Sequence, residues 1–164
     1  MPDMISIAIT ILKHNNQFLF LKRRKAPYEN LWSLVGGKVD LGEHIAPASI
    51  REVMEETGTT HVHDYEYRGV VSERLIKPDG SLLAHFLIFV GFARLFDFKA
   101  SHREGELRLF DESEISSLKD TFLPSDVRMF ESFKSASQES NLFEAELVYD
   151  GSRYLLNYYR EAGT

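Results

Sequence analysis

Residues 36–58 hold the stretch that decides the fold: Gly36-Gly37-Lys38-Val39-Asp40-Leu41-Gly42-Glu43 and, after seven further residues, Arg51-Glu52-Val53-Met54-Glu55-Glu56-Thr57-Gly58. Residues 45–57 predict a helix, because Pro47 falls in the first turn, where its missing N–H costs little, and Gly58 provides a C-terminal stop. We expect Ala48, Val53 and Met54 to hold this helix to the core.

Three glutamates of this helix share one face. Glu52, Glu55 and Glu56 stand at positions i, i+3 and i+4. Taken alone, three such acids are explained equally simply as an exposed acidic surface of the helix that faces outward into water. The upstream glycine pair, where a backbone carbonyl could approach an ion, favours a metal site instead, as do the neighbouring Arg51 and Glu43. Oxygen ligands of this kind suit Mg²⁺ or Mn²⁺, which recruit phosphate oxygens to complete their coordination.

The spacing of these residues resembles the Nudix box. Its signature positions are matched by Gly37, Glu43, Arg51-Glu52-Val53, Glu55-Glu56 and Gly58. Only Thr59 departs, standing where the family has an aliphatic residue, and we do not expect this packing position to affect the chemistry. Residues 31–39, 122–126 and 143–161 further resemble the MutT-type enzymes that hydrolyse oxidised purine nucleoside triphosphates such as 8-oxo-dGTP.

The resemblance implies a fold and an activity. The fold would be the Nudix α/β/α sandwich of the α/β class, a mixed β-sheet between helices, formed as a single domain by residues 1–164. The activity would be Mg²⁺-dependent hydrolysis of a nucleoside 5′-triphosphate to the nucleoside monophosphate and pyrophosphate, with Mn²⁺ as an alternative cation. Other hypotheses are an ADP-ribose or nucleotide-sugar substrate, RNA cap removal, and a non-catalytic nucleotide sensor. The intact glutamate trio argues against the sensor.

The resemblance also implies roles for the residues around the box. One to three cations would be held by the trio and the glycine backbone, that is, by Glu52, Glu55, Glu56, Gly36 and Gly37. Arg51 and Glu43 would orient the carboxylates. The general base would come from the trio or from a loop, where Glu106 is the candidate and Glu104 its competitor. Either loop acid taken alone is equally well explained as a solvated surface residue.

Substrate contacts are expected from four further residues: Arg23, Ser33, Lys38 and Asp126. Compared with the oxidised-purine enzymes, Ser33 replaces an asparagine and Ser125 replaces the first of two adjacent acids. Asp126 therefore remains as the predicted reader of the base. We expect a roomy, weakly selective pocket walled by Ser33 and residues 28–32.

Composition limits the partners. The 164 residues carry a net charge of −6, which disfavours duplex nucleic acid, and they include no cysteine, which excludes thiol chemistry. A free nucleotide can still bind an acidic protein through bridging cations. Met1-Pro2-Asp3 shows no signal-like segment, and no stretch is apolar enough to span a bilayer, so we expect a cytoplasmic protein. The oligomeric state is left open.

Outside the box, the pattern predicts about six strands and three helices. Strands are expected at 4–12, 17–22, 65–76, 82–94, 143–149 and 154–159, and further helices at 111–118 and 125–134. Residues 26–34 are expected to form a loop, because Pro27, Tyr28 and Asn30 fit no period.

Overall fold

The computed structural model describes residues 3–99, 101–102, 105–136 and 140–164. Its strands are β1 (Met4–His14), β2 (Gln17–Arg23), β3 (Trp32–Ser33), β4 (Val35–Lys38), β5 (His63–Ile76), β6 (Leu82–Arg94), β7 (Ser101–His102), β8 (Gly105–Phe110), β9 (Leu142–Tyr149) and β10 (Tyr154–Glu161). Its helices are α1 (Ile45–Thr57), α2 (Glu112–Ser117) and α3 (Pro124–Phe133), with a 3₁₀ turn at Lys119–Thr121.

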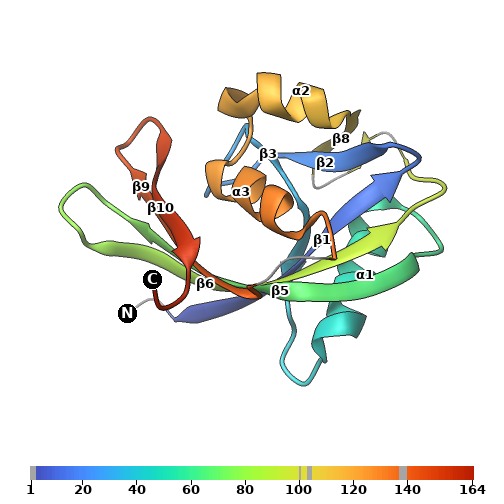
Figure 1. The fold of residues 1–164 in the computed structure, drawn as a ribbon, viewed down its shortest axis with the longest axis horizontal. Coiled ribbons are helices and arrows are strands. Elements are labelled where there is room, and N and C mark those ends of the chain that lie inside the picture. The colour runs from blue at the N-terminus through green and yellow to red at the C-terminus, as the bar shows by residue number, and fades with distance from the viewer. Residues whose placement is uncertain (1–2, 100, 103–104, 137–139) are drawn as a thin grey trace.

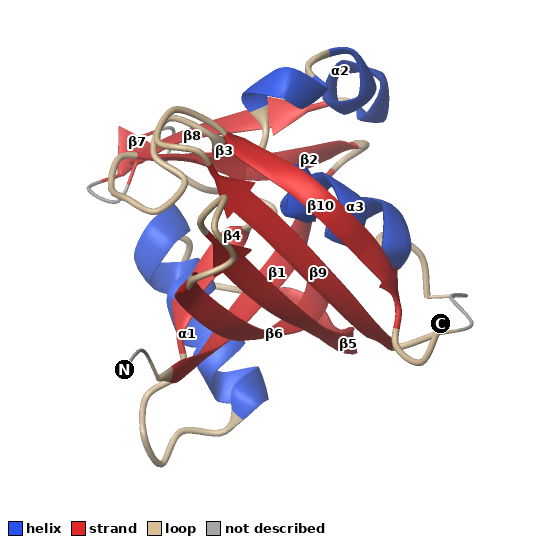
Figure 2. Ribbon diagram, turned by 90° about the vertical axis from the view of Figure 1, so that its left-hand side faces the viewer, coloured by secondary structure: helices blue, strands red, loops and turns tan. Residues whose placement is uncertain are grey.

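The strands form one curled, mixed sheet (Figures 1 and 2). The order is β10-β9-β5-β6-β1-β2-β8-β7, with β3 paired to β2 and β4 paired to β1. The β1–β6 and β5–β9 pairs are parallel, whereas β1–β2, β5–β6 and β9–β10 are antiparallel. In Figure 1, α1 lies on one side of this sheet and α2 and α3 lie on the other.

Alternation along β1 and β2 builds a core on each face of the sheet. Ile11 and Phe20 pack with the buried side chains of α3, such as Phe130. Leu12 and Leu19, one residue away along the same strands, pack with Val53 of α1. The predicted α/β class and the helix–sheet–helix arrangement are therefore confirmed.

Helix α1 has the predicted bounds. Gly58 adopts the left-handed conformation at φ 72°, and its N–H donates to the carbonyl of Met54, which ends the helix. Ala48 and Val53 are fully buried, as expected. Met54 was predicted to contact the core, and this is wrong, because its side chain is 40% exposed. Its position places it on the side of the helix away from the sheet.

Four short strands, β3, β4, β7 and β8, lie where no strand was predicted. β3 falls within the expected loop 26–34, β4 contains the glycine pair, and β8 contains Glu106. In β4, Gly36 pairs with Ile9 and Gly37 with Ala8 of β1. A Cβ on Gly36 would lie 2.1 Å from the carbonyl oxygen of Ala8, so the close approach of these two strands requires glycine.

Within the described residues, the helices are all too short or too polar to cross a lipid bilayer.

Candidate active site

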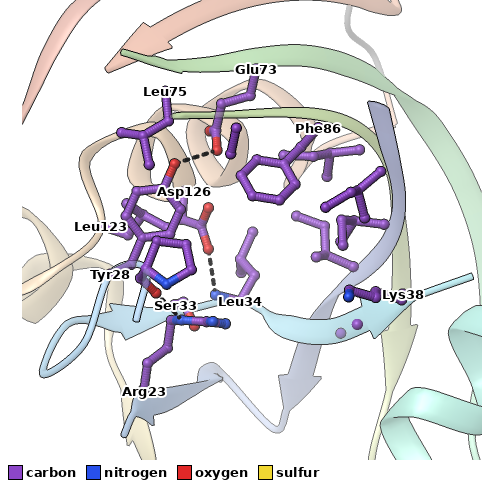
Figure 3. A pocket seen from close by; sticks show the side chains of 18 of the residues that line it. Arg23, Tyr28, Ser33, Leu34, Lys38, Glu73, Leu75, Phe86, Leu123 and Asp126 are labelled. Atoms are coloured by element: carbon purple, nitrogen blue, oxygen red, sulfur yellow. Dashed lines mark hydrogen bonds between the residues drawn. The ribbon is translucent and has the colours of Figure 1, made fainter. Parts of the chain in front are cut away.

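A cavity of about 780 Å³ is lined by residues of several strands, of α1 and of α3. It gathers residues that lie far apart in the sequence, from Ile5 on β1 to Tyr154 on β10. In Figure 3, Lys38 lies on one side of this cavity, and Tyr28 and Asp126 lie on the other. We call these the glycine side, which includes Gly36, Gly37 and the α1 glutamates, and the carboxyl-pair side, which includes Glu73 and Asp126.

The three predicted glutamates all line the cavity. Their face of α1 was expected to point outward, and this holds for Glu55 but not for its neighbours. Glu56 is only 6% exposed and Glu52 is mostly buried, whereas Glu55 is exposed at the open edge of the cavity. Glu52 and Glu56 are therefore partly withdrawn from bulk water, which strengthens their electrostatic interaction with an ion beside them.

Glycine at position 37 lets the Glu52 carboxylate lie directly on β4. A Cβ built on Gly37 would stand 2.5 Å from Oε2 of Glu52 and 2.7 Å from Oε1. Gly37 thus leaves a recess in which the carboxylate meets the strand backbone. Both glycines of the pair line the cavity, as the metal prediction requires.

Arg51 organises the acids around it. Its Nε and Nη2 donate to the two oxygens of Glu43 at 2.7 and 2.8 Å, and its Nη1 donates to Glu52 at 2.9 Å and to Glu55 at 3.2 Å. Nη2 also donates to the carbonyl of Lys38 at 3.1 Å, which ties α1 to the end of β4. The bidentate pair, together with the Asp40 N–H, lowers the pKa of Glu43 to about 2.

The chemistry of the glycine side fits a hard divalent cation. Burial raises the pKa of Glu52, an effect that Arg51 opposes, so added positive charge here would favour its ionised form. Among the described residues, no three acidic or histidine side chains already converge at metal-binding distance. Arg51 takes one oxygen of Glu52 and one of Glu55, and completing a cation's coordination would require these side chains to turn.

The carboxyl-pair side contains two deeply buried acids. The Tyr28 hydroxyl donates to Oε2 of Glu73 at 3.0 Å, and the N–H of Leu34 donates to Oδ2 of Asp126 at 2.8 Å (Figure 3). Burial, together with the charge of Glu73, raises the pKa of Asp126 to about 7. Burial also raises the pKa of Glu73, and burial beside Glu73 raises that of Tyr28 well above its ordinary value.

All four predicted substrate-contacting residues line the same cavity. Ser33 is buried and donates its hydroxyl to the carbonyl of Leu21 at 3.3 Å, which fixes its position between β2 and β3. Arg23 extends from the end of β2, with Nε donating to the carbonyl of Pro27 at 3.0 Å. Lys38 lies at the end of β4, and Asp126 lies in the first turn of α3.

Two expectations about the surroundings of the site are wrong. Glu106 was expected in a loop, but it lies on β8, paired with Lys22 of β2, and is not among the cavity-lining residues. Trp32 was expected to help wall a base pocket, but it is buried in the core, edge-to-face with Phe110 at 5.1 Å. Glu104 falls outside the described residues.

Glu73 and two tyrosines line the cavity without having been predicted. Tyr149 and Tyr154, from β9 and β10, stack at 4.5 Å, and Tyr154 meets Tyr28 edge-to-face at 4.8 Å. The only sequence signal for Glu73 is an acid inside a strand, where its neighbours are Ser72 and Arg74. The alternation of side chains along β5 puts Glu73 on one face of the sheet, but the residues around it in the sequence do not indicate that this face lines a cavity.

The chain combines a curled mixed sheet with an acidic helix that packs against a glycine-containing strand. A sequence profile of the NUDIX domain matches residues 3–142, and the chain belongs to the Nudix family. The relatives of this chain include proteins named as a diphosphatase, an RNA pyrophosphohydrolase and an ADP-ribose pyrophosphatase.

Three relatives differ in their named substrates. A putative 8-oxo-dGTP diphosphatase of Bacillus subtilis is 44% identical over 50 residues, which are 30% of this chain and 32% of the relative. An RNA pyrophosphohydrolase of Campylobacter jejuni is 25% identical over 71% of this chain and 79% of the relative. An ADP-ribose pyrophosphatase of Methanocaldococcus jannaschii is 40% identical over 29% of this chain and 28% of the relative. The first and third alignments span about a third of each relative's length.

A solved structure matches nearly the whole chain. The MutT protein of Bacillus halodurans is 25% identical to this chain, with a TM-score of 0.74 over 98% of this chain and 99% of that one.

Proposed function

We propose that this protein hydrolyses a nucleoside 5′-triphosphate to the nucleoside monophosphate and pyrophosphate, with Mg²⁺ or Mn²⁺ as the cation. The observation that carries the proposal is the shared cavity, in which the α1 glutamates lie on one side and Ser33 and Asp126 on the other. This spacing lets one ligand present its phosphates to the glutamates and its base to the polar residues of α3. A cavity of about 780 Å³ is large enough for a nucleotide.

On the glycine side, Glu52, Glu55 and Glu56 would hold the cation with the backbone of β4. When bound, the cation would supply charge neutralisation at the phosphates and a more acidic water. Arg51 keeps the carboxylates oriented through its contacts to Glu43, Glu52 and Glu55. In the reaction a water oxygen bonds to phosphorus, the anhydride P–O bond breaks, pyrophosphate leaves, and a glutamate accepts the proton of the water.

On the carboxyl-pair side, the base would lie among Tyr28, Ser33 and Asp126. We expect several purine nucleoside triphosphates to be hydrolysed, with 8-oxo-dGTP favoured modestly, because Ser33 is shorter than the amide that the oxidised-purine enzymes have. Arg23 and Lys38 would contact phosphate or base from the ends of β2 and β4.

An RNA 5′ end is a second candidate substrate, because the Campylobacter jejuni relative aligns over 71% of this chain. The deciding experiment is a substrate panel assayed with Mg²⁺ and with Mn²⁺, with released pyrophosphate and phosphate measured separately. The panel should include dGTP, 8-oxo-dGTP, ATP, ADP-ribose and a short 5′-triphosphate RNA. Fastest pyrophosphate release from the free triphosphates supports the proposal, whereas faster turnover of ADP-ribose or of the RNA would replace it.

A further inference from the structure

Glu73 has no role in the hydrolysis described above, although it is a fully enclosed acid at a binding cavity. Its side chain is 1% exposed and comes from the middle of β5, whereas Asp126, 5% exposed, comes from α3. Both carboxyl groups line the cavity. Within the described part of the chain, Oε1 of Glu73 has no short hydrogen-bond partner, although the Ser125 hydroxyl stands close enough to the carboxyl to act as a donor that lowers its pKa. An enclosed acceptor without a partner is costly unless a ligand or a proton satisfies it.

Arg23 of β2 supplies positive charge to this pair and lowers the pKa of both carboxyls, an effect smaller than that of burial. Tyr28 reaches Glu73 from the loop before β3, and Tyr159 of β10 faces Asp126; both are neutral phenols. Ser125 adjoins Glu73 from α3.

Two neighbouring carboxyls in such surroundings do not both ionise, because burial and mutual repulsion each disfavour the second charge. The proton then belongs to the pair rather than to either residue. A pair that retains one proton offers one O–H donor together with several acceptor oxygens.

We propose that Glu73 and Asp126 share one proton and together determine which base the cavity binds. The O–H of the pair would donate to an acceptor atom on the edge of the base, and the remaining carboxyl oxygens would accept from the N–H groups beside that atom. The inference rests on the proposed function, since it concerns the base-binding side of the same site. It makes Glu73 a specificity-determining residue and makes base binding dependent on a proton of the protein. The negative charge of the pair disfavours an anionic group on this side, and the cation proposed for the glycine side would attract the phosphates there.

The test is binding of deoxyguanosine without metal, because this nucleoside has no phosphate and its base does not titrate between pH 5.5 and 8.5. Affinity is measured across this range by NMR titration for the wild type and Glu73→Gln. The wild-type affinity should fall by up to about tenfold per pH unit once the pair loses its proton. In Glu73→Gln the amide is a permanent donor, so the affinity should vary less than about twofold over the same range.

Glu29→Gln is the matched control, because Glu29 contacts Tyr154 near the cavity but is not part of the pair. This variant should keep the wild-type pH dependence. Asp126→Asn provides a second test if Glu73→Gln fails to fold, and it too should flatten the profile. Equal pH dependence in the wild type and in whichever pair variant folds would overturn the inference.

The proposed function is tested separately through hydrolysis. If the wild type hydrolyses dGTP with Mg²⁺ and Glu73→Gln removes the pH dependence of KM, both proposals are supported. Hydrolysis by the wild type without any effect of Glu73→Gln on the pH profile of KM contradicts only the carboxyl pair. Absence of triphosphate hydrolysis by the folded wild type contradicts the proposed function, while the deoxyguanosine measurement still decides the pair.

Discussion

The carboxylate of Glu52 rests on the α-carbon of Gly37, so closely that a β-carbon there would stand 2.5 Å from Oε2. This contact joins the glycine strand to the acidic helix, and it explains why the two halves of the sequence motif depend on each other. Glycine at position 36 has a different reason, since its missing side chain accommodates the backbone of Ala8 on the neighbouring strand.

The two glycines should therefore fail in different ways when changed to alanine. Gly37→Ala displaces only the end of a flexible side chain, so we expect a small loss of stability and a decrease in kcat on the order of 10²-fold. Gly36→Ala forces strand backbones apart and should lower the free energy of unfolding by about 3 kcal/mol. Urea denaturation and steady-state kinetics separate the two effects. Equal losses of stability in both variants would contradict the contact described here.

The charges of the α1 glutamates should be essential for turnover but not for folding. Glu55→Gln and Glu56→Gln remove negative charge at the proposed cation ligands, and each should lower kcat by about 10²-fold or more. Removal of one of several like charges should also leave the melting temperature of the metal-free protein unchanged or raise it. Near-normal turnover in both variants, measured with Mg²⁺ in excess, would overturn their assignment as ligands.

Much of this arrangement follows from the sequence, because helix periodicity and glycine spacing act over short distances. The bounds of α1, the stop at Gly58 and the sharing of one face by the glutamates are local consequences of residues 45–58. The direction of that face depended on where the sheet lies. An outward face was predicted because apolar residues hold the opposite side of α1 to the core, but in the fold the glutamates line the cavity, with only Glu55 exposed and Arg51 providing compensating charge.

The parts that could not be predicted depend on long-range pairing. β3 exists because it adds to β2, and residues 32–33 alone are too short to indicate a strand. Residues 106–109 of β8 alternate polar and apolar side chains, a strand signal that the sequence prediction missed. Glu73 and Asp126, 53 positions apart in the sequence, line one cavity only because α3 packs against the sheet. Trp32 was misplaced for the same reason, because its aromatic neighbours come from β8 and the turn before α3.

Asp126 should make the stability of the fold depend on pH. Its pKa in the folded protein is raised to about 7 from an ordinary 3.8, so the folded state holds a proton that the unfolded state has lost. The contribution is complete below pH 3.8 and is lost as the pH rises through about 7. We expect Asp126→Asn to gain stability relative to the wild type between pH 4.5 and pH 8. Urea denaturation of both proteins at pH 4.5 and at pH 8 measures this gain. An equal difference in the free energy of unfolding between Asp126→Asn and the wild type at the two pH values would contradict it.

Asp126 should also influence the choice of base more than the maximal rate, because the proposed cation ligands lie on the other side of the cavity. Asp126→Ala should bring the ratio of kcat/KM for 8-oxo-dGTP and dGTP close to one while kcat for dGTP falls less than about tenfold. The wild-type ratio is the reference. An unchanged ratio would mean that Asp126 only caps the N–H of Leu34 and stabilises the start of α3.

The most direct test of the account is product analysis of dGTP hydrolysis with Mg²⁺, performed on the wild type and Glu56→Gln with and without excess chelator. The account predicts deoxyguanosine monophosphate and pyrophosphate in equal amounts from the wild type with Mg²⁺. It predicts no turnover with chelator and a decrease of about 10²-fold or more in the variant. Release of single phosphate groups, or hydrolysis that persists in chelator, would contradict the proposed reaction and its cation site.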